Sequence, residues 1–207
     1  MIILGVTGSI GMGKTEAGKY FIKNNIDVFN CDKEIASFYN KIDTINEIRK
    51  KFPSVVFNNK VDKNALANIV FNDKVKLKLL EGLIHKKLKL VQSCWLRKKI
   101  REKKKILVFD VPLLFEKDNI KKYDIVVVLS CNKTLQRRRV LKRQNWNEER
   151  YEKTLKEQIP DNIKQTLADI IIKSDRGKRH LHKEIIKIIK EIKNRKSRKT
   201  QEILKEF

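Results

Sequence analysis

Five short apolar runs, rich in β-branched residues, recur along the 207-residue chain. Each run is nearly continuous in apolar character instead of alternating with polar residues, as strands that are covered on both faces require. The stretches between the runs place apolar residues at helical spacing. Strands that alternate with helices predict an α/β fold with a five-stranded parallel sheet flanked by helices. The expected strands are Ile2 to Thr7, Asp27 to Asn30, Ile106 to Asp110, Ile125 to Ser130 and Ile170 to Lys173.

The connection between the second and third expected strands is too long for a single crossover helix. It contains a series of apolar residues at helical spacing, so we expect a helical insertion over residues 32–104. The chain length suits one domain, whose core would comprise residues 1–31, 105–133 and 160–195. The apolar series in the insertion is Ala65, Ile69, Leu77, Leu80, Leu83, Ile84, Leu88 and Val91.

Residues 134–159 are strongly basic and polar, with few side chains to bury. We expect two helices here, with a turn over residues 145–147 and the second helix beginning near Glu148. Such a hairpin would stand away from the core and could move as a lid. After Gly177 an amphipathic helix is expected to cover the sheet, and residues 196–207 are expected to form a basic, solvated tail.

The formal charge of +24, from 49 basic and 25 acidic residues, admits two interpretations. Clustered lysines and arginines bind nucleic acids through counterion release. Here Lys far outnumbers Arg and the basic residues run through almost every segment, which indicates a compositional bias instead. We therefore expect no nucleic-acid partner, although a positive field would steer a nucleotide substrate toward the protein.

The apolar run at the start of the chain is too short for a membrane-spanning helix or a signal sequence. We therefore expect a cytoplasmic protein with no membrane partner, as a monomer or a weak homo-oligomer. The three cysteines, Cys31, Cys94 and Cys131, are scattered, lack metal-binding spacing and leave an odd number for pairing. They are expected to be reduced and structurally ordinary.

The first expected strand leads into a glycine-rich turn, GSIGMGKT, at residues 8–15. This is the GxxxxGK[ST] pattern of a P-loop, and it lies between a strand and helix-forming sequence, as that pattern requires. The glycines let backbone N–H groups surround a phosphate, Lys14 reaches the β- and γ-phosphates, and the Thr15 hydroxyl binds Mg²⁺. The glycine spacing does not fit a dinucleotide site, so we expect the loop to hold a nucleoside triphosphate.

A near match to a guanine-binding motif bears on the choice of base. Residues 132–135, NKTL, follow the fourth strand and begin like the NKxD signature, but Leu135 replaces the aspartate that accepts the hydrogens of guanine. Without that carboxylate, we expect an adenine nucleotide, ATP, accompanied by Mg²⁺.

Two carboxylates follow expected strands. Asp110 closes the third strand, where P-loop proteins place the acidic residue that orients Mg²⁺. Asp32 closes the second strand and has two interpretations. It could cap a helix that starts at Lys33, which spacing alone favours. It could also accept the proton of an attacking hydroxyl, if the strand order brings the second strand near the first.

The expected lid carries arginines at positions 137, 138, 139 and 143. Mobile arginines can neutralise the charge on a transferring phosphoryl group while they exclude water. Arg139 and Arg143 are four residues apart and so would lie on one helix face, whereas most of the run would be a solvated face. His85 could be a ligand, a substrate contact or a satisfied core residue, and spacing slightly favours the last.

Taken together, these motifs resemble the dephospho-CoA kinases, which catalyse the last step of coenzyme A biosynthesis. The resemblance covers about residues 1–192 and rests on GVTGSIGMGKT, NCDKEIA, LIHKKL, VFDVPLLFE, QRRRVLKRQ and EQIPDNIKQTLADIIIKSD. It implies a P-loop kinase fold with a helical substrate-binding insertion and a helical lid. It also implies ATP-dependent phosphorylation of the 3′-hydroxyl of dephospho-CoA, with coenzyme A and ADP as products.

The resemblance further implies roles for particular residues. Asp32 becomes the base that orients the acceptor hydroxyl, which reverses the interpretation that spacing favours. Lys14 acts in catalysis with the lid residues Arg139 and Arg143, and Asp110 holds Mg²⁺ with Thr15 through the nucleotide. The implied ATP loop is Gly8, Gly11, Met12, Gly13, Lys14, Thr15 and Glu16, and the implied substrate side is Asp32, His85, Pro112, Leu113, Leu114 and Glu116.

Three positions depart from the family pattern. Ser9 stands where the family usually has Gly, Glu16 where it has Ser or Thr, and Lys86 where it has Pro. A hydroxyl at position 16 commonly touches the α-phosphate, so Glu16 implies somewhat weaker nucleotide binding.

Two other functions are compatible with the P-loop alone. One is a P-loop kinase that acts on a nucleoside monophosphate or a similar small acceptor. The identity of the acceptor would distinguish the two kinds of kinase. The other is a nucleotide switch or a nucleic-acid-binding ATPase, against which the incomplete NKxD motif and the dispersed lysines weigh.

Overall fold

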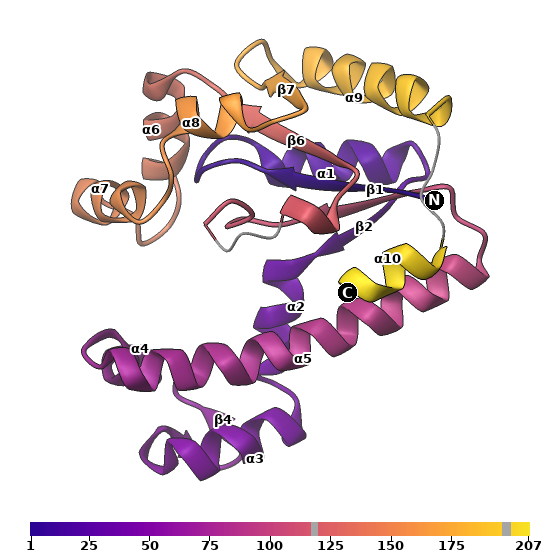
Figure 1. Cartoon of the computed structure of the whole chain (residues 1–207). Coiled ribbons are helices and arrows are strands. Elements are labelled where there is room, and N and C mark those ends of the chain that lie inside the picture. The colour runs from indigo at the N-terminus through magenta and orange to yellow at the C-terminus, as the bar shows by residue number, and fades with distance from the viewer. Residues whose placement is uncertain (117–119, 196–199) are drawn as a thin grey trace. The chain divides into compact units, whose positions relative to one another are not determined.

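The computed structural model describes residues 1–116, 120–195 and 200–207. The chain divides into two compact units, one formed by Met1–Asn30 with Arg97–Phe207 and the other by Cys31–Leu96. The first unit contains a five-stranded sheet, and the second contains helices and a small β-hairpin (Figure 1). Within the described residues, no helix is long and apolar enough to cross a membrane.

The five expected strands form one parallel sheet in the order β2-β5-β1-β6-β7. The three central strands are buried along their whole length, whereas residues of β2 and β7 at the edges are partly exposed. The order places β5 between β1 and β2, so the second strand is not a neighbour of the first. The strands are β1 Ile2–Thr7, β2 Asp27–Asn30, β5 Ile106–Asp110, β6 Ile125–Ser130 and β7 Ile170–Lys173.

Two helices cover one face of the sheet. They are α1, Lys14–Lys23, and α9, Lys178–Lys193, which begins after Gly177 as expected. Phe21 of α1 and Ile185 of α9 are fully buried in one apolar cluster with the side chains of alternate strand residues. Because side chains alternate along a strand, residues such as Phe109 between these positions face the other side of the sheet.

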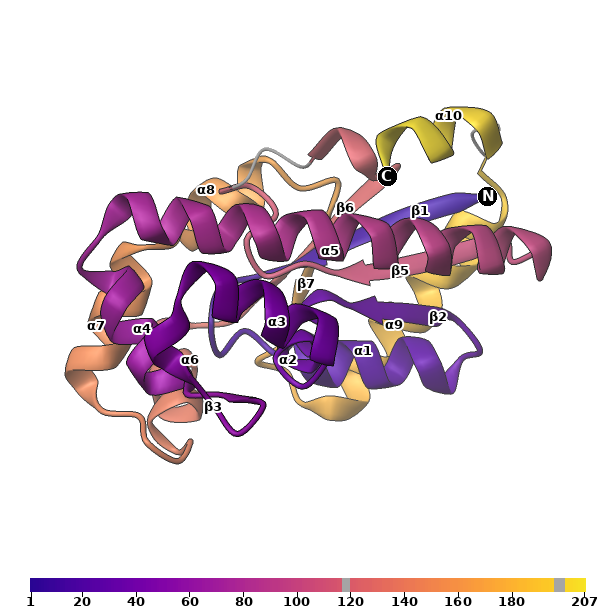
Figure 2. The ribbon, with the colours of Figure 1, turned by 90° about the horizontal axis from the view of Figure 1, so that it is seen from below.

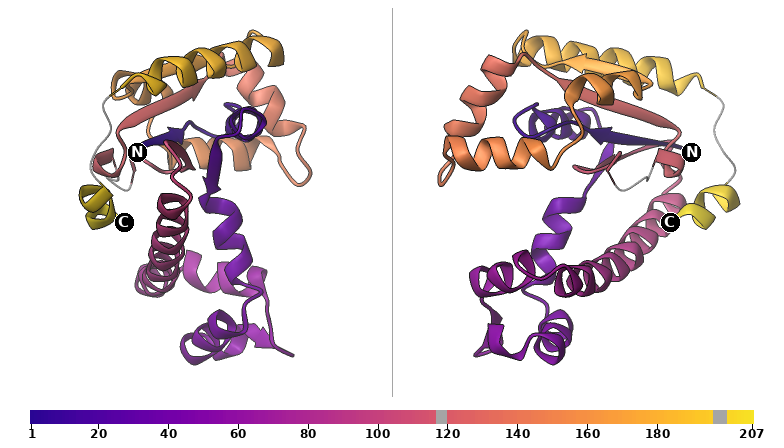
Figure 3. Two further views of the ribbon diagram at one scale, coloured as in Figure 1. Left: turned by 90° about the vertical axis from the view of Figure 1, so that its right-hand side faces the viewer. Right: turned by 60° about the vertical axis from the view of Figure 1, so that its left-hand side comes forward.

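The expectation of a solvated C-terminal tail is wrong for its described part, while residues 196–199 lie outside the described residues. Residues Thr200–Glu206 form α10, on the opposite side of the sheet from α9 (Figure 3). Ile203 and Phe207 are buried, and the ring centroid of Phe207 lies 4.8 Å from that of Phe109 on β5. Ile203 lies in α10 and Phe207 directly follows its last residue, so this C-terminal segment adds apolar cover to the sheet.

Replacing Phe207 with alanine should lower the free energy of unfolding by about 2 kcal/mol. This is below the usual cost of a buried Phe→Ala change, because a terminal helix can detach locally while the sheet stays folded. Chemical denaturation measures the change. Leu204 lies in α10, three residues before Phe207, and is 36% exposed, so Leu204→Ala is the control and should stay within about 0.5 kcal/mol of the parent. Equal losses in the two variants would contradict the packing assigned to Phe207.

The second unit, Cys31–Leu96, has an apolar core of its own. The apolar series that was expected to form one helical pattern is divided there between two helices, α4 and α5. Asp73 caps the second of them, α5, because its carboxylate accepts hydrogen bonds from the N–H groups of Val75 and Lys76. Figure 2 shows the helices of this unit, which are α2 Cys31–Phe38, α3 Ile42–Lys51, α4 Lys63–Phe71 and α5 Lys74–Arg101 as far as Leu96.

A short β-hairpin in the second unit was not expected from the sequence. It pairs β3, Val56–Phe57, with β4, Lys60–Val61, and follows the 3-10 helix η1, Pro53–Val55. The two turn residues, Asn58 and Asn59, have φ values of +46° and +56°. Asparagine adopts this conformation more readily than most residues and favours two-residue hairpin turns.

The lid region forms the expected pair of helices, α6 Lys133–Leu141 and α7 Glu148–Lys156. Arg137 of α6 makes two hydrogen bonds, of 2.7 and 2.6 Å, to the carboxylate of Glu148 at the start of α7. The hairpin does not stand away from the core, because Val140 is fully buried and packs beside the P-loop. The remaining short helices of the first unit are α8 Asp161–Thr166 and η2 Ile120–Lys122.

Candidate active site

The glycine-rich turn links β1 to α1, and its glycines have φ values that other residues rarely adopt. The φ angles of Gly8, Gly11 and Gly13 are +151°, +79° and +97°. A Cβ atom at position 8 would also lie 2.6 Å from the carbonyl oxygen of Leu129, so both the conformation and the space require glycine. The turn ends at the N-terminus of α1, where the direction of the backbone N–H groups and the helix dipole favour a phosphate.

Lys14 begins α1 and reaches back across the turn that precedes it. Its Nζ donates a hydrogen bond of 3.1 Å to the carbonyl oxygen of Gly8. Thr15 follows in the first turn of the helix and is exposed. The positions of the ammonium group and the hydroxyl at one end of the turn are those that the P-loop pattern predicts for binding phosphate and Mg²⁺.

Glu16 stands at one of the positions that depart from the family pattern. Its carboxylate pairs with Lys19 on the same helix at 3.3 Å and with Lys178 at the start of α9 at 3.7 Å. Burial raises the pKa of the Glu16 carboxyl, but the hydrogen bond from Lys19 and the charges of both lysines outweigh it, so the pKa is lowered. The negative charge next to the P-loop is therefore held by two cations.

Asp110 lies at the end of β5, between the ends of two neighbouring strands. It is in register with Val6 of β1 and with Asn30 of β2. The carboxylate is buried, and its Oδ2 accepts a hydrogen bond of 2.7 Å from the Asn30 amide. This bond fixes the orientation of a carboxylate that is one strand away from the P-loop.

The oxygen atoms of Thr15 and Asp110 suit Mg²⁺, which prefers hydroxyl, carboxylate, phosphate and water ligands. In the described part of the chain, no group of three or more His, Cys, Asp or Glu residues could hold a metal by itself. An ion bound by this pair would therefore complete its coordination with nucleotide phosphates and water.

Arg139 ties α6 to both the P-loop and the end of β7. Its guanidinium donates hydrogen bonds of 2.8 Å to the hydroxyl and the carbonyl oxygen of Ser174, and one of 3.3 Å to the carbonyl oxygen of Gly11. Ser174 in turn donates from its hydroxyl to the carbonyl oxygen of Met12 at 2.8 Å. The guanidinium is thus fixed beside the P-loop instead of moving with a free lid.

Arg143 does not share the position of Arg139. Helix α6 ends at Leu141, and Arg143 lies in the turn that follows and is exposed. The expectation that both arginines lie on one helix face is therefore wrong, because the helix is two residues too short.

The residues after β5 divide between the core and the surface. Leu113 is exposed, whereas Leu114 is fully buried. A Cβ atom on Gly5 would lie 2.7 Å from Leu114 Cδ1, so Leu114 packs directly on β1 and is a core residue. Pro112 is held by its carbonyl oxygen, which accepts a hydrogen bond of 3.3 Å from the hydroxyl of Thr7. Leu113 and Pro112 are the members of this group that a substrate could reach.

The carboxylate of Glu116 is occupied within the first unit. Its Oε1 lies 2.8 Å from Nζ of Lys164, which is fully buried on α8, and accepts a hydrogen bond of 3.0 Å from the N–H of Ile159. Burial raises the pKa of Glu116, but the ion pair with Lys164 and the hydrogen bonds outweigh it and lower the pKa. The geometry favours a structural link from the β5 loop to α8.

The residues that resemble a guanine motif have a structural role. Asn132 is the N-cap of α6, and its side-chain oxygen accepts a hydrogen bond of 2.8 Å from the N–H of Leu135. N-cap asparagines stabilise helices in this way, which accounts for the presence of Asn132 without a guanine base.

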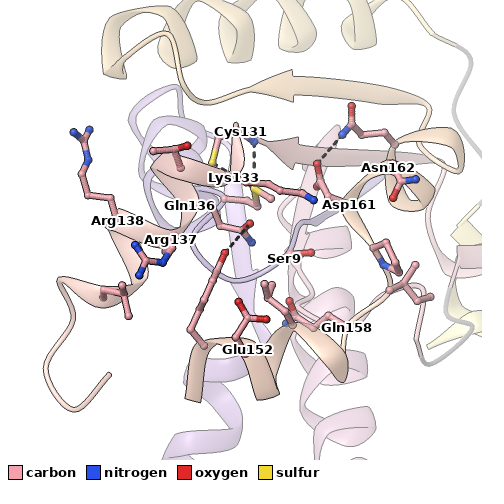
Figure 4. Close-up of a pocket in the computed structure, with 18 of the residues that line it drawn as sticks. Ser9, Cys131, Lys133, Gln136, Arg137, Arg138, Glu152, Gln158, Asp161 and Asn162 are labelled. Atoms are coloured by element: carbon pink, nitrogen blue, oxygen red, sulfur yellow. Dashed lines mark hydrogen bonds between the residues drawn. The ribbon is translucent and has the colours of Figure 1, made fainter. Parts of the chain in front are cut away.

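A cavity of about 1260 Å³ lies among α6, α7, α8 and the base of the P-loop (Figure 4). Helix α6 presents Arg137 and Arg138 to this cavity, whereas its Val140 and Arg139 lie against the P-loop. The lining includes Ser9 and Met12 of the phosphate-binding turn but not Lys14, so the cavity borders the base of the turn and not its phosphate-binding end.

Two further expected site residues, Asp32 and His85, belong to the second unit, Cys31–Leu96. Helix α2 begins at Cys31, so Asp32 lies in its first turn instead of closing β2 or capping a helix that starts at Lys33. His85 is exposed on α5 beside the buried residue Ile84, so the interpretation of His85 as a core residue is wrong.

Three polar residues join these elements without having been singled out from the sequence. Gln136 and Gln158 bind the backbone of Ile10 in the P-loop, and Lys164 pairs with Glu116. In a local pattern each looks like a solvent-facing position of a polar helix. Only the tertiary structure shows that Gln136 and Lys164 are buried.

Comparison with known proteins points to one family. The family model for dephospho-CoA kinase matches residues 2–179. The dephospho-CoA kinase of Bartonella quintana is 35% identical over 189 residues, which cover 91% of this chain and 97% of the relative. The crystal structure of a Thermus thermophilus protein has a TM-score of 0.81 at 24% identity, covers 92% of this chain and 96% of its own, and supports the fold alone. The solved dephospho-CoA kinase of Campylobacter jejuni has a TM-score of 0.69 at 26% identity, with the same coverage.

Proposed function

Because the chain belongs to the dephospho-CoA kinase family, we propose that it transfers the γ-phosphoryl group of ATP to the 3′-hydroxyl of dephospho-CoA. The products are coenzyme A and ADP. The observation that carries the proposal is the P-loop of this chain, with Lys14 at its end and Asp110 at the end of the adjacent strand. Phosphoryl transfer depends on positioning and on neutralising charge, and these two residues serve both purposes.

On the nucleotide side, the backbone N–H groups of the turn surround the phosphates and Lys14 contacts the β- and γ-phosphates. Thr15 and Asp110 would hold Mg²⁺, which neutralises charge on the phosphate oxygens when it is bound. Arg139 lies against the carbonyl oxygen of Gly11, and we assign it a place beside the nucleotide, where its charge favours a bound polyanion. Arg143, in the exposed turn, would approach the nucleotide only if the tip of the hairpin moves.

On the acceptor side, Asp32 is proposed to orient the 3′-hydroxyl and to accept its proton as the new P–O bond forms. A carboxylate suits this step because it accepts hydrogen bonds and carries a negative charge near neutral pH. His85, Pro112 and Leu113 are proposed contacts for the acceptor. Transfer is in line, from the γ-phosphate to the oxygen that Asp32 holds.

The acceptor distinguishes this proposal from another small-molecule kinase. Dephospho-CoA should stimulate the release of ADP from Mg-ATP. AMP and CMP should leave the rate at the level measured without an acceptor. Lys14→Ala is the matched inactive control. Stimulation by a nucleoside monophosphate alone would retain the P-loop assignment and overturn the assignment of the acceptor.

We further propose that the enzyme acts in the cytoplasm as a monomer or weak homo-oligomer, without a nucleic-acid partner.

A further inference from the structure

The P-loop residue Ile10 is held at both of its backbone polar groups by two glutamines. Nε2 of Gln136 donates a hydrogen bond of 2.8 Å to the carbonyl oxygen of Ile10. The N–H of Ile10 donates one of 3.1 Å to Oε1 of Gln158. Gln136 lies on α6 and Gln158 lies just after α7 (Figure 4), so each arm of the helical hairpin supplies one contact.

The chemistry of the backbone fixes the orientation of both side chains. A carbonyl oxygen can only accept and an N–H group can only donate, so Gln136 must offer its NH₂ group to Ile10 and Gln158 its oxygen. Gln136 is buried, and its own oxygen accepts a hydrogen bond of 3.4 Å from the hydroxyl of Tyr151 on α7. At Ile10, Gln136 must therefore act as a hydrogen-bond donor and Gln158 as a hydrogen-bond acceptor.

The contacts act on a segment that would otherwise be flexible. Ile10 precedes Gly11, and glycine-rich backbone loses more conformational entropy than other backbone when it becomes ordered. A Cβ atom on Gly11 would lie 2.8 Å from Cγ2 of Val140, so α6 also packs tightly against the turn. Together these contacts order the turn before any phosphate binds.

We propose that Gln136 and Gln158 are positioning residues that act through Ile10 and hold the P-loop in its phosphate-binding shape. They also fix the base of the helical hairpin to the P-loop, so that any lid motion is confined to its tip. The effect on catalysis rests on the ATP-dependent function proposed above, whereas the ordering of Ile10 does not. A site that is already ordered binds its ligand more tightly because it pays less entropy on binding.

The first test uses Gln158, because it stands at the end of the hairpin and is only partly buried. Gln158→Leu should raise the KM for ATP about tenfold, as expected when a hydrogen bond is lost and its donor is left without a partner. The KM for dephospho-CoA should change less than twofold. The control is Gln144→Leu, an exposed residue in the hairpin turn, which should leave both KM values unchanged.

The second test measures amide hydrogen exchange at Ile10 by NMR in the absence of nucleotide, and so it does not depend on the acceptor or on activity. Exchange should be about tenfold faster in Gln158→Leu than in the parent, because an unpaired N–H is less protected. Gln158→Glu keeps an acceptor oxygen and should retain the protection. Gln136→Glu removes the donor to the carbonyl oxygen and should not retain the ordered turn.

The outcomes separate the proposal from a general loss of folding. Equal exchange rates at Ile10 in the parent and in Gln158→Leu would overturn it, as would equal losses of protection in Gln158→Glu and Gln158→Leu. If Gln158→Leu does not fold, Gln158→Met takes its place with the same expected results. If the exchange result holds while dephospho-CoA is not phosphorylated, the positioning role stands and the proposed acceptor is wrong.

Discussion

Replacing Asp32 with asparagine should lower kcat about 10²- to 10⁴-fold, the usual range for loss of a positioned general base. The amide keeps the size of the carboxylate but removes its charge and its ability to take a proton. The proposed partner of Asp32 is the acceptor hydroxyl and not the nucleotide, so the dissociation constant for ATP should change less than about threefold. Steady-state kinetics and calorimetric titration with a non-hydrolysable ATP analogue measure the two effects.

Asp43→Asn is the matched control for this experiment. Asp43 lies in the same unit, and its side chain is 65% exposed and pairs with Lys87 at 2.8 Å. Lys87 also pairs with Glu47 at 2.9 Å, so the same chemical change at Asp43 leaves Lys87 a partner and should leave kcat within about twofold. A near-normal kcat in Asp32→Asn would remove Asp32 from the proposed role. A parallel loss of ATP binding would show that Asp32 acts on the nucleotide instead of the acceptor.

Replacing Lys164 with methionine should lower the free energy of unfolding by about 3–5 kcal/mol, the usual cost of breaking a buried ion pair. Lys164 is fully buried and the side chain of Glu116 is 12% exposed, so the substitution leaves a carboxylate with little access to water. Urea denaturation at neutral pH measures the change. The control is Lys156→Met on the exposed side of α7, which should stay within about 0.5 kcal/mol of the parent.

The double variant with Glu116→Gln and Lys164→Met should recover at least half of that loss. Glutamine is neutral and keeps an oxygen for the N–H of Ile159, so no buried charge remains.

The pKa of Glu116 is lowered from an ordinary value of 4.5, so the stability that the ionised carboxylate contributes is present above that value and is lost as pH falls through the lower folded pKa. The difference between the parent and Lys164→Met should therefore be full at neutral pH and shrink in acid. An equal or larger loss in the double variant would contradict the ion-pair account.

The sequence predicts the strands of the sheet well because the residues of each strand are themselves enough to indicate it. Each strand is a continuous apolar run, and the observed strand bounds are the expected ones. The pattern cannot give the strand order, and β5 lies between β1 and β2. The structure also places Asp110 at the end of β5, as expected, because a strand that ends in a carboxylate is visible in the sequence.

Tertiary contacts account for most of what the sequence did not predict. The C-terminal segment looked solvated because its apolar residues are few, yet Ile203 in α10 and Phe207 directly after it are buried. The β-hairpin was missed because its strands have two residues each, too few for an alternating pattern. Lys164 is buried through a partner 48 positions away in the chain, Glu116, and no local pattern reports such a pairing.

The direct test of the proposed reaction is to follow the γ-phosphoryl group itself. The enzyme is incubated with Mg-ATP labelled in that group, together with dephospho-CoA or with its 3′-deoxy analogue, which has no acceptor hydroxyl. The proposed function predicts label in coenzyme A, no label in the analogue, and no transfer by Lys14→Ala. Label in the analogue, or release of labelled phosphate to water with no labelled coenzyme A, would contradict it.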